Sequence, residues 1–265
     1  MYKIINDESQ LKFFFDNIMR PFSPLEAYFV SLAARNKYLT EEEQEQLHLG
    51  RSEMMSPTIL NEYNFDKFLS KIKRFECNDK GSFLTKNNSY IPQKALSCYI
   101  NINPSDTLKA LYEFRRITEE YYKEFLSSYT KGGHPDTSKL KSTNIMLLTS
   151  YQNNYSEKIW LDIDMDVDKG FFNNDNRKDF ADYCKSQNLN TVYIIDTHSG
   201  FHVLIKVSEL KFNPQDIVEF LTELYIANNT ISASAKTEII INKNMMIPLP
   251  GTFAGNYPIT ISRLD

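Results

Sequence analysis

The feature that most constrains this chain is an alternation of apolar and acidic residues between Leu161 and Asp168. Successive side chains of a β-strand point to opposite faces, so a period of two places all four aspartates on one face. The pattern predicts a strand over residues 158–167 with one face in a core and one face carrying charge. Carboxylates two residues apart lie roughly 7 Å from each other and repel, which favours a cation bound beside them.

Two simpler interpretations of the aspartates are a solvated strand face and a calcium loop. The EF-hand pattern opens with D-x-D-x-D, but it needs glycine at the sixth position and glutamate at the twelfth. Counted from Asp162, these positions hold Val167 and Asn173, which excludes the EF-hand. Only Lys158 and Lys169 lie nearby as basic residues, so we favour a metal site over a solvated face.

Length and composition indicate a globular protein of one or two domains, because 265 residues with 42% hydrophobic content can bury a core. No long apolar run and no signal-peptide layout is present, so we expect a cytoplasmic protein without a membrane partner. The three cysteines are widely spaced, which argues against a disulfide framework and a zinc site. The net charge of −4 does not decide on nucleic-acid binding, because local basic patches make phosphate contacts.

The pattern of elements changes near residue 90. We expect residues 1–90 to form a mainly helical N-terminal region, with helices over 8–19, 25–37 and 65–75 and another beginning at Thr40. Lys71, Lys73 and Arg74 end the last of these helices, either as a favourable C-terminal charge cluster or as a phosphate contact. A strand over 95–103 and a long helix from Thr107 to about Ser128 follow.

The second half of the chain predicts six elements in an informative order. They are a strand over 158–167, a helix over 176–187, strands over 191–196 and 201–207, a helix over 214–227 and a strand near 236–241. This β-α-β-β-α-β order is that of ferredoxin-like sheets, including RNA-recognition folds and polymerase palms. We therefore predict an α+β fold, which by itself decides no function.

Two further motifs accompany the acidic strand. The hairpin turn contains Ser199, Gly200 and His202, whose hydroxyl, backbone amides and imidazole suit a phosphate; a purely structural histidine is the alternative. Glu238 opens an apolar strand about a dozen residues before Pro-Gly-Thr, at 250–252. The predicted order of strands can place Glu238 beside the acidic strand, although a solvent-facing glutamate is equally compatible with the sequence.

Together these motifs resemble the catalytic core of the archaeo-eukaryotic primase superfamily, the primase-polymerases. The resemblance rests on an h-D-h-D strand, an S-G-x-H turn before an apolar strand, and an acid before a P-G-T segment, and it covers roughly residues 95–265. It implies a primase-polymerase fold with an RNA-recognition-like palm in residues 91–265, preceded by the mainly helical residues 1–90.

The resemblance also assigns roles to single residues. As metal-binding catalytic acids it implies Asp162, Asp164 and Glu238. As nucleotide-binding residues it implies Ser199, Gly200, His202 and, at the end of an early strand, Asn103. The sequence leaves open whether Asp166 replaces one of the assigned metal ligands.

This chain departs from the family pattern at two positions. The third acid is usually aspartate in the family, whereas Glu238 is one methylene longer, a difference that a metal ligand tolerates. The family commonly carries an arginine before its P-G-T segment, where Pro248 stands here. Another base, such as Lys206, Lys236 or Lys243, would then have to supply the missing phosphate contact.

The implied activity is template-dependent nucleotidyl transfer by a primase or DNA polymerase that uses two Mg²⁺ or Mn²⁺ ions about 4 Å apart. The expected partners are ribo- or deoxyribonucleoside triphosphates, single-stranded or primer-template nucleic acid, and replication or CRISPR-associated proteins. Replication, repair, mobile-element and CRISPR-associated pathways all stay open. The alternatives are a metal-dependent nuclease and a non-catalytic RNA-recognition-like module that stacks bases on Tyr193 and Phe201.

Overall fold

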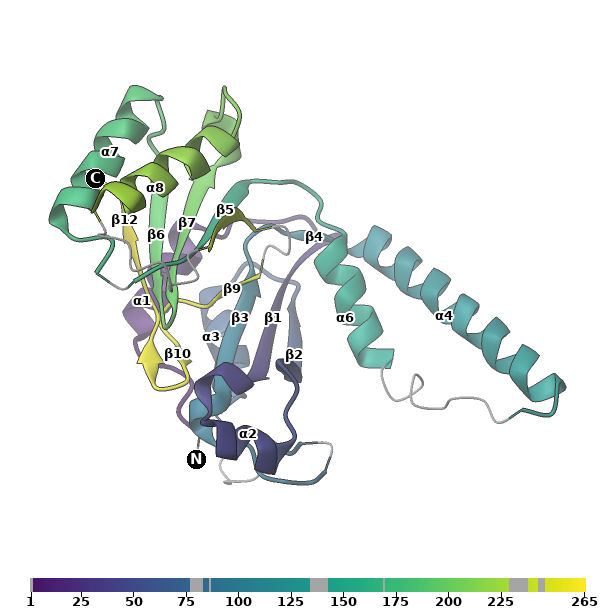
Figure 1. The fold of residues 1–265 in the computed structure, drawn as a ribbon. Helices are drawn as coiled ribbons and strands as arrows, with labels where there is room; N and C mark the ends of the chain where they lie inside the picture. The colour runs from purple at the N-terminus through teal and green to yellow at the C-terminus, as the bar shows by residue number, and fades with distance from the viewer. Residues whose placement is uncertain are drawn as a thin grey trace.

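The structure is a computed structural model that describes residues 2–76, 83–85, 87–133, 143–168, 170–228, 238–242 and 246–265. Its described strands form two antiparallel sheets, one of seven strands and one of five, and helices flank both (Figure 1). This arrangement confirms the predicted α+β class.

The first sheet has the order β11-β10-β3-β1-β2, with β4 also paired to β1 and β9 to β3. Its strands are β1 (Glu26–Arg35), β2 (Ser52–Leu60), β3 (Leu96–Asn101), β4 (Ser105–Asp106), β9 (Met246–Pro248), β10 (Phe253–Ala254) and β11 (Tyr257–Pro258). Segments from both ends of the chain therefore meet in this one sheet.

The predicted helix over 25–37 is wrong, because these residues form β1 instead. The strand is buried from Ala27 to Ala34 without interruption, since it lies inside the sheet and is covered on both faces. A strand buried on both faces shows no alternation, so periodicity cannot distinguish it from a buried helix. Residues 1–90 also contribute β2, and β1 pairs with β3, so this region is not the mainly helical layer that the sequence suggested.

The other helices predicted in this region are confirmed, as α1 (Glu8–Asn17), α2 (Glu41–Leu47) and α3 (Phe65–Lys73). Thr40 and Glu43 form a capping box at the start of α2, which satisfies amides that the first helical turn leaves unpaired. The described residues also contain three short 3₁₀ helices, η1 (Asn36–Tyr38), η2 (Gln93–Ala95) and η3 (Val207–Glu209).

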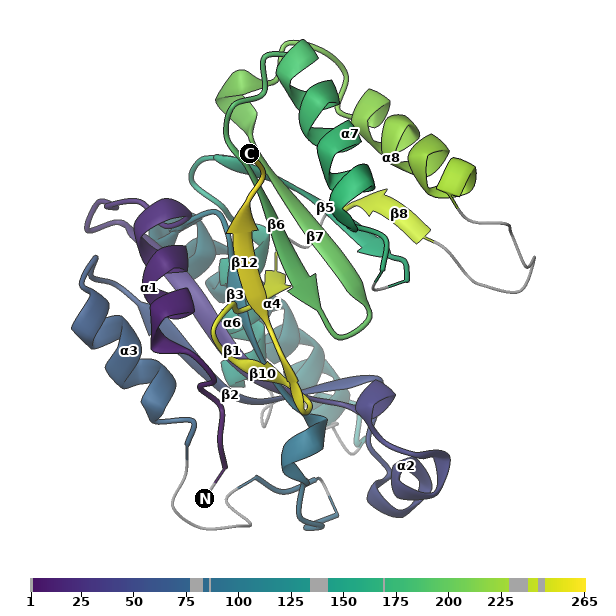
Figure 2. The same ribbon diagram turned by 90° about the vertical axis from the view of Figure 1, so that its left-hand side faces the viewer.

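The second sheet has the order β12-β6-β7-β5-β8. Its elements are β5 (Trp160–Asp166), α7 (Asn174–Ser186), β6 (Val192–Thr197), β7 (Gly200–Lys206), α8 (Gln215–Asn228), β8 (Glu238–Ile241) and β12 (Thr260–Arg263). The predicted β-α-β-β-α-β order is confirmed, and β8 pairs with β5. Both helices lie on one face of this sheet (Figure 2).

The two faces of the second sheet are buried against different partners. Leu161, Ile163 and Met165 pack in the core beneath α7 and α8. On the opposite face, Trp160 and Leu204 join the core of the first sheet, and the Trp160 indole donates to the carbonyl of Ile18 after α1 at 2.8 Å. The aspartates of β5 share this second face, so part of it is apolar and part is acidic.

A helical hairpin of α4 (Thr107–Thr130) and α6 (Thr143–Asn153) extends away from the two sheets (Figure 1). Among the described side chains of α4, only Ala110 and Tyr121 are buried. Several large apolar side chains of α4 are exposed, namely Leu108, Leu111, Tyr112, Tyr122, Leu126 and Tyr129. No helix within the described residues is both long and apolar enough to cross a membrane.

Candidate functional site

A cleft of about 1170 Å³ separates the acidic face of the second sheet from the end of the first. One wall carries Asp164 and Asp166 of β5 together with His202 of β7. The part of the cleft formed by the first sheet carries three basic side chains, Arg35 at the end of β1, Lys37 of η1 and Arg51 before β2, beside the acidic Glu53 of β2. We call the three basic residues the basic wall; it lines the same open volume as the acids of β5.

The aspartates of β5 differ in depth although they share a face. Asp162 is 2% exposed, the Asp164 side chain is 40% exposed, and Asp166 lies at the exposed end of the strand. Asp164 and Asp166 line the cleft, whereas Asp162 does not. The acidic strand therefore runs from the core into the cleft.

Asp162 has its hydrogen-bond partners within the protein. Its carboxylate accepts from the His202 Nδ1 at 3.0 Å and from the Asn242 Nδ2 at 2.6 Å. The backbone N–H of Asn242 also donates to the Asp162 carbonyl at 2.9 Å. Asn242, which the sequence motifs did not indicate, therefore fixes this carboxylate from the β8 side while His202 fixes it from β7.

His202 lies between two carboxylates. Its Nδ1 contacts Asp162, and its Nε2 lies 3.7 Å from the Asp164 Oδ1. Burial lowers the pKa of His202, but the charges of Asp162 and Asp164 and the hydrogen bond to Asp162 outweigh it and raise the pKa to about 9. The imidazole is therefore a buried cation at neutral pH.

Asp164 lies in an environment that disfavours its charge. Burial is the main cause that raises its pKa, and the nearby carboxylates of Asp162 and Asp166 add to the effect. The positive charges of His202 and Lys37 oppose it without reversing its direction. A carboxylate in this position gains from any further cation in the cleft.

The turn between β6 and β7 needs glycine for a steric reason. Gly200 has a φ of +147°, and a Cβ atom there would lie 1.9 Å from the carbonyl oxygen of Met165. The neighbouring Ser199 faces the cleft, where its Oγ accepts a hydrogen bond from the Lys37 Nζ at 2.9 Å. The structure thus brings Ser199 and His202 to the cleft beside Asp164, with Gly200 permitting the close approach of β5 and β7.

Glu238 is paired with Asp166 across β8 and β5, as the predicted strand order allowed. Residues directly opposite in an antiparallel pair share a face, with Cβ atoms about 5 Å apart. The Glu238 side chain is exposed and does not line the cleft. Within the described residues, no three His, Cys, Asp or Glu side chains converge closely enough to bind a metal ion.

Asn103 was expected to contact the nucleotide, but it does not line the cleft. Its side chain is buried, and its Oδ1 accepts from the backbone N–H groups of Ile159 at 2.7 Å and Trp160 at 2.8 Å. Its Nδ2 donates to the Trp160 carbonyl at 3.0 Å. Asn103 therefore fixes the start of β5 on the end of the first sheet.

Of the lysines expected to replace the missing arginine, the structure describes only Lys206. Lys206 is exposed at the far end of β7, opposite Trp160, and does not line the cleft. It lies four residues from His202, roughly 13 Å along the strand. Lys236 and Lys243 fall outside the described residues.

The basic wall was not predicted from the sequence. Arg35 donates from its Nη1 to the Tyr99 hydroxyl at 2.7 Å, which holds the guanidinium against β3. Lys37 has a pKa lowered mainly by burial and next by Arg35, while Asp166 and Asp164 act in the opposite direction. Arg35 and Lys37 lie more than a hundred positions from the acidic strand, in a segment predicted as helix. No local sequence pattern therefore linked them to the acidic strand.

Tyr193 and Phe201 are both buried, at 4% exposure each, so neither is presented for base stacking as the binding-module alternative expected.

Comparison with known proteins found no matching family, no matching curated protein and no matching solved structure. The chemistry of the cleft is therefore the basis on which a function can be assigned.

Proposed function

We propose that this chain is a divalent-metal-dependent nucleotidyltransferase of the primase-polymerase type, which extends a nucleic-acid strand from nucleoside triphosphates on a template. The observation that carries the proposal is the cleft with Asp164 and Asp166 on one wall and Arg35, Lys37 and Arg51 on the other. A metal-bound triphosphate needs acidic oxygen ligands for its cations and basic groups for its phosphates. The β-α-β-β-α-β sheet beneath the acids is compatible with the palm of such an enzyme.

The acids of the cleft fit Mg²⁺ or Mn²⁺, since carboxylate oxygens are the ligands that these ions prefer. Burial and the neighbouring carboxylates raise the pKa of Asp164, so a bound cation would stabilise its charged form. We propose Asp164 and Asp166 as the principal ligands; Glu238, at the facing position on β8, would have to turn toward them to add a third carboxylate. Two bound ions would activate the attacking 3′-hydroxyl and stabilise the leaving pyrophosphate.

Asp166 takes the place first assigned to Asp162 in this proposal. The Asp162 carboxylate is buried and accepts hydrogen bonds from His202 and Asn242, so it is already engaged within the protein. Its role is to orient the imidazole and to keep it protonated. Asp162 therefore acts through His202 and is a positioning residue.

His202 and the basic wall bind phosphate. The His202 Nε2 faces Asp164 at the edge of the cleft and, when protonated, donates a charged hydrogen bond to a phosphate oxygen. Arg35 and Arg51 supply the phosphate contacts that were expected from an arginine before the P-G-T segment. Lys37, bonded to Ser199, adds a third positive charge next to the turn.

Incorporation of labelled nucleotides on a single-stranded template with Mn²⁺ tests the proposal. We expect the wild type to incorporate nucleotides and the Asp164→Asn/Asp166→Asn double variant to lose activity. Asp168→Asn is the matched control, because Asp168 is exposed beyond the end of the strand and does not line the cleft.

The proposal fails if the wild type incorporates nothing with any metal or template, or if the double variant stays as active as the wild type. Shortening of the strand without added nucleotides, again dependent on Asp164 and Asp166, would instead establish the nuclease alternative. Thermal unfolding of the double variant checks that it is folded at the assay temperature; because the charge of Asp164 contributes to the raised pKa of His202, its midpoint should lie below that of the control.

A further inference from the structure

One side of α4 carries a continuous stripe of large exposed side chains. We call the following six residues, separated in turn by four, three, four, three and four positions, the α4 stripe: Leu108, Tyr112, Arg115, Glu119, Tyr122 and Leu126. Steps that average 3.5 residues keep one side of a helix turned toward a partner helix. On the opposite side of α4, Ala110 packs with Tyr151 and Leu147 of α6. The stripe is therefore the side of α4 that α6 leaves uncovered (Figure 1).

The apolar side chains of this face are exposed to a degree that is rare for their size. Tyr112 is 72% exposed and Leu126 is 59% exposed. Leu111 and Tyr129, which are also exposed, widen and lengthen the same side of the helix. A contiguous apolar surface along a helix indicates an interaction site.

The order of residue types along the α4 stripe is the same from either end. In both directions it is a leucine, a tyrosine, two residues of opposite charge, a tyrosine and a leucine, with the same steps of four and three. A two-fold axis at the level of Ile117 would therefore place Leu108 opposite Leu126 of a second copy. The same axis would place Tyr112 opposite the second Tyr122. This self-complementarity is what a two-fold interface between identical chains requires.

The two charges at the centre of the stripe specify how the second copy is oriented. Arg115 and Glu119 are paired at 2.7 Å within α4, and their side chains are 79% and 52% exposed. In an antiparallel pair of helices, Arg115 of each copy meets Glu119 of the other, whereas a parallel pair would bring like charges together. An antiparallel pair shifted by seven residues would instead place these charges against Leu126 and Tyr122. The charges therefore favour one orientation and one register, as polar residues do in coiled coils.

The cation beside the stripe does not oppose this arrangement. Arg116 lies next to the two-fold axis, where the two copies of it would approach each other. Its guanidinium is paired with Glu113 and with Glu120, each at 2.7 Å, so its charge is compensated within α4. On the other flank, Leu111 and Thr118 carry no charge.

The size of the contact is that of a reversible dimer. From Leu108 to Leu126 the stripe is about 27 Å long. The leucines and tyrosines of two stripes, together with the Arg–Glu pairs, would bury on the order of 1,000 Å² in total. This area is at the lower limit for a specific interface, so we expect a Kd on the order of micromolar.

We propose that the α4 stripe is a dimerisation surface, through which two copies of this chain associate as an antiparallel pair of helices. The helix extends away from both sheets, as this contact requires (Figure 1). None of the six stripe residues lines the cleft, so the dimer is independent of the nucleotidyl transfer proposed for the cleft.

Sedimentation equilibrium without metal or nucleotides, at protein concentrations from about 1 to 300 μM that bracket the expected Kd, tests the proposal. We expect the mass of the wild type to rise from that of one chain toward that of two. Leu126→Ser removes two leucine contacts from the symmetric interface and should weaken association roughly 100-fold.

Charge reversal tests the orientation of the two helices. Arg115→Glu leaves only acids at the centre of the stripe and Glu119→Arg leaves only bases, so each variant alone should associate about tenfold more weakly or worse. An equimolar mixture of the two should regain the wild-type affinity as a heterodimer, which also shows that both variants are folded. The double variant Arg115→Glu/Glu119→Arg should associate like the wild type.

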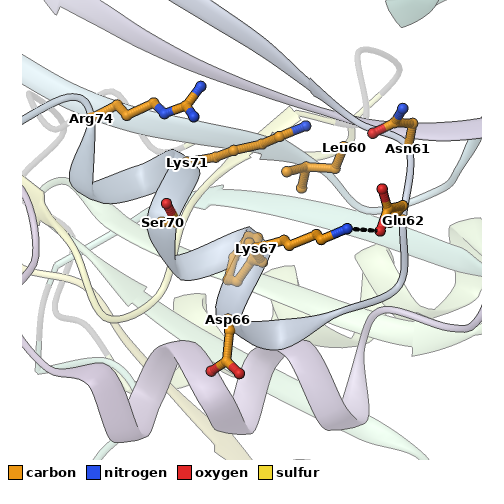
Figure 3. A pocket seen from close by; sticks show the side chains of 9 residues that line it. Leu60, Asn61, Glu62, Asp66, Lys67, Ser70, Lys71 and Arg74 are labelled. Carbon is orange, nitrogen blue, oxygen red and sulfur yellow. Dashed lines mark hydrogen bonds and ion pairs between the residues drawn. The ribbon is translucent and has the colours of Figure 1, made fainter.

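The matched control is an exposed ion pair on α3. Figure 3 shows Lys67 paired with Glu62, and their side chains are 58% and 54% exposed. Lys67→Glu changes the net charge by the same amount as Arg115→Glu and breaks an ion pair of the same kind. Because Lys67 lies outside the stripe, this variant should dimerise like the wild type.

The proposal is overturned if the wild type stays monomeric at all concentrations, or if Leu126→Ser and the charge variants dimerise as well as the wild type. A mixture of the charge variants that associates more tightly than the wild type would reject the antiparallel orientation and indicate a parallel pair. A monomer that binds phosphatidylcholine vesicles, and loses this binding in Leu126→Ser, would reject a second copy and indicate a lipid surface. None of these measurements requires activity, so a failure of the catalytic proposal leaves them interpretable.

Discussion

The buried pair of Asp162 and His202 makes a measurable prediction about stability and pH. The His202 Nδ1 lies 3.0 Å from the Asp162 carboxylate, and both side chains are shielded from water. Burial alone lowers the pKa of this histidine, and the two nearby carboxylates reverse the effect and raise it to about 9. Asp162→Asn removes the closer charge but keeps the size and shape of the side chain.

The expected magnitude follows from the pKa of His202. Its value of about 9 in the folded chain exceeds the ordinary 6.5, and each pKa unit corresponds to about 1.4 kcal/mol. Protonated His202 therefore stabilises the folded state by about 3 kcal/mol. Because the pKa is raised, this stabilisation is complete below pH 6.5 and is lost as the pH rises through 9.

Urea unfolding in the presence of a metal chelator, at a series of pH values between about 6 and 10, measures this effect. We expect the wild-type free energy of unfolding to fall by about 3 kcal/mol over that range. In Asp162→Asn the imidazole should be neutral across the range, so this fall should disappear and the variant should differ most from the wild type near pH 6. Asp166→Asn, which removes an exposed carboxylate of the same strand, should keep the wild-type slope.

The difference between variants is the informative quantity, because other groups also titrate in this range. Burial raises the pKa of the Cys98 thiol and raises that of Cys184 to about 12, so both thiols destabilise the folded chain as the pH exceeds about 8.5. They are unchanged in Asp162→Asn and cancel in the comparison. A variant that keeps the full wild-type slope, or a wild type whose stability does not fall over this range, would refute the assigned charge state of His202.

Three further predictions concern the cleft and the strands that position it. Arg35→Gln and Arg51→Gln should each raise the KM for a nucleoside triphosphate by roughly tenfold, since a hydrogen bond to a charged group contributes about 1.5–3 kcal/mol; an unchanged KM in steady-state incorporation would remove them from the site. Gly200→Ala should lower the free energy of unfolding by about 3 kcal/mol or more, measured in urea, because its Cβ would lie 1.9 Å from the Met165 carbonyl oxygen. Asn103→Ala should lower the free energy of unfolding by about 2–3 kcal/mol, because it leaves backbone groups at the start of β5 unpaired. The KM of this variant for a nucleoside triphosphate should stay at the wild-type value, and a raised KM would mean that Asn103 contacts the nucleotide.

The sequence predicted the elements in which the pattern of apolar and polar residues matches the faces that the tertiary structure buries and exposes. β5 has one face in a core and one face in a polar setting, so its alternation was visible in the chain. The turn at Gly200 follows from the short hairpin. Whether His202 shares the face of the aspartates could not be derived from the periodicity, and the register that places His202 opposite Asp164 shows that it does.

The basic wall could not be predicted, because its position depends on contacts between distant segments. β1 is covered on both faces and has no period of two, and β2 was not recognised as its partner. Arg35 and Arg51 reach the cleft only because these strands pair with each other and β1 pairs with β3. Likewise, the hydrogen bonds of Asn103 to the backbone of β5 join residues more than fifty positions apart.

Alternation also explains why the sequence did not distinguish the environments of Asp162 and Asp166. A period of two specifies the face of each aspartate, but it contains no information on how far along the strand the neighbouring sheet extends. Trp160 and Leu204 pack into the core of the first sheet, so the start of β5 is covered and Asp162 is buried with it. From Asp164 onward that cover ends and the aspartates line the cleft. One repeated motif therefore supplies a buried carboxylate that charges His202 and exposed carboxylates that can bind cations. The same substitution should accordingly change stability and its pH dependence at Asp162 but activity alone at Asp166.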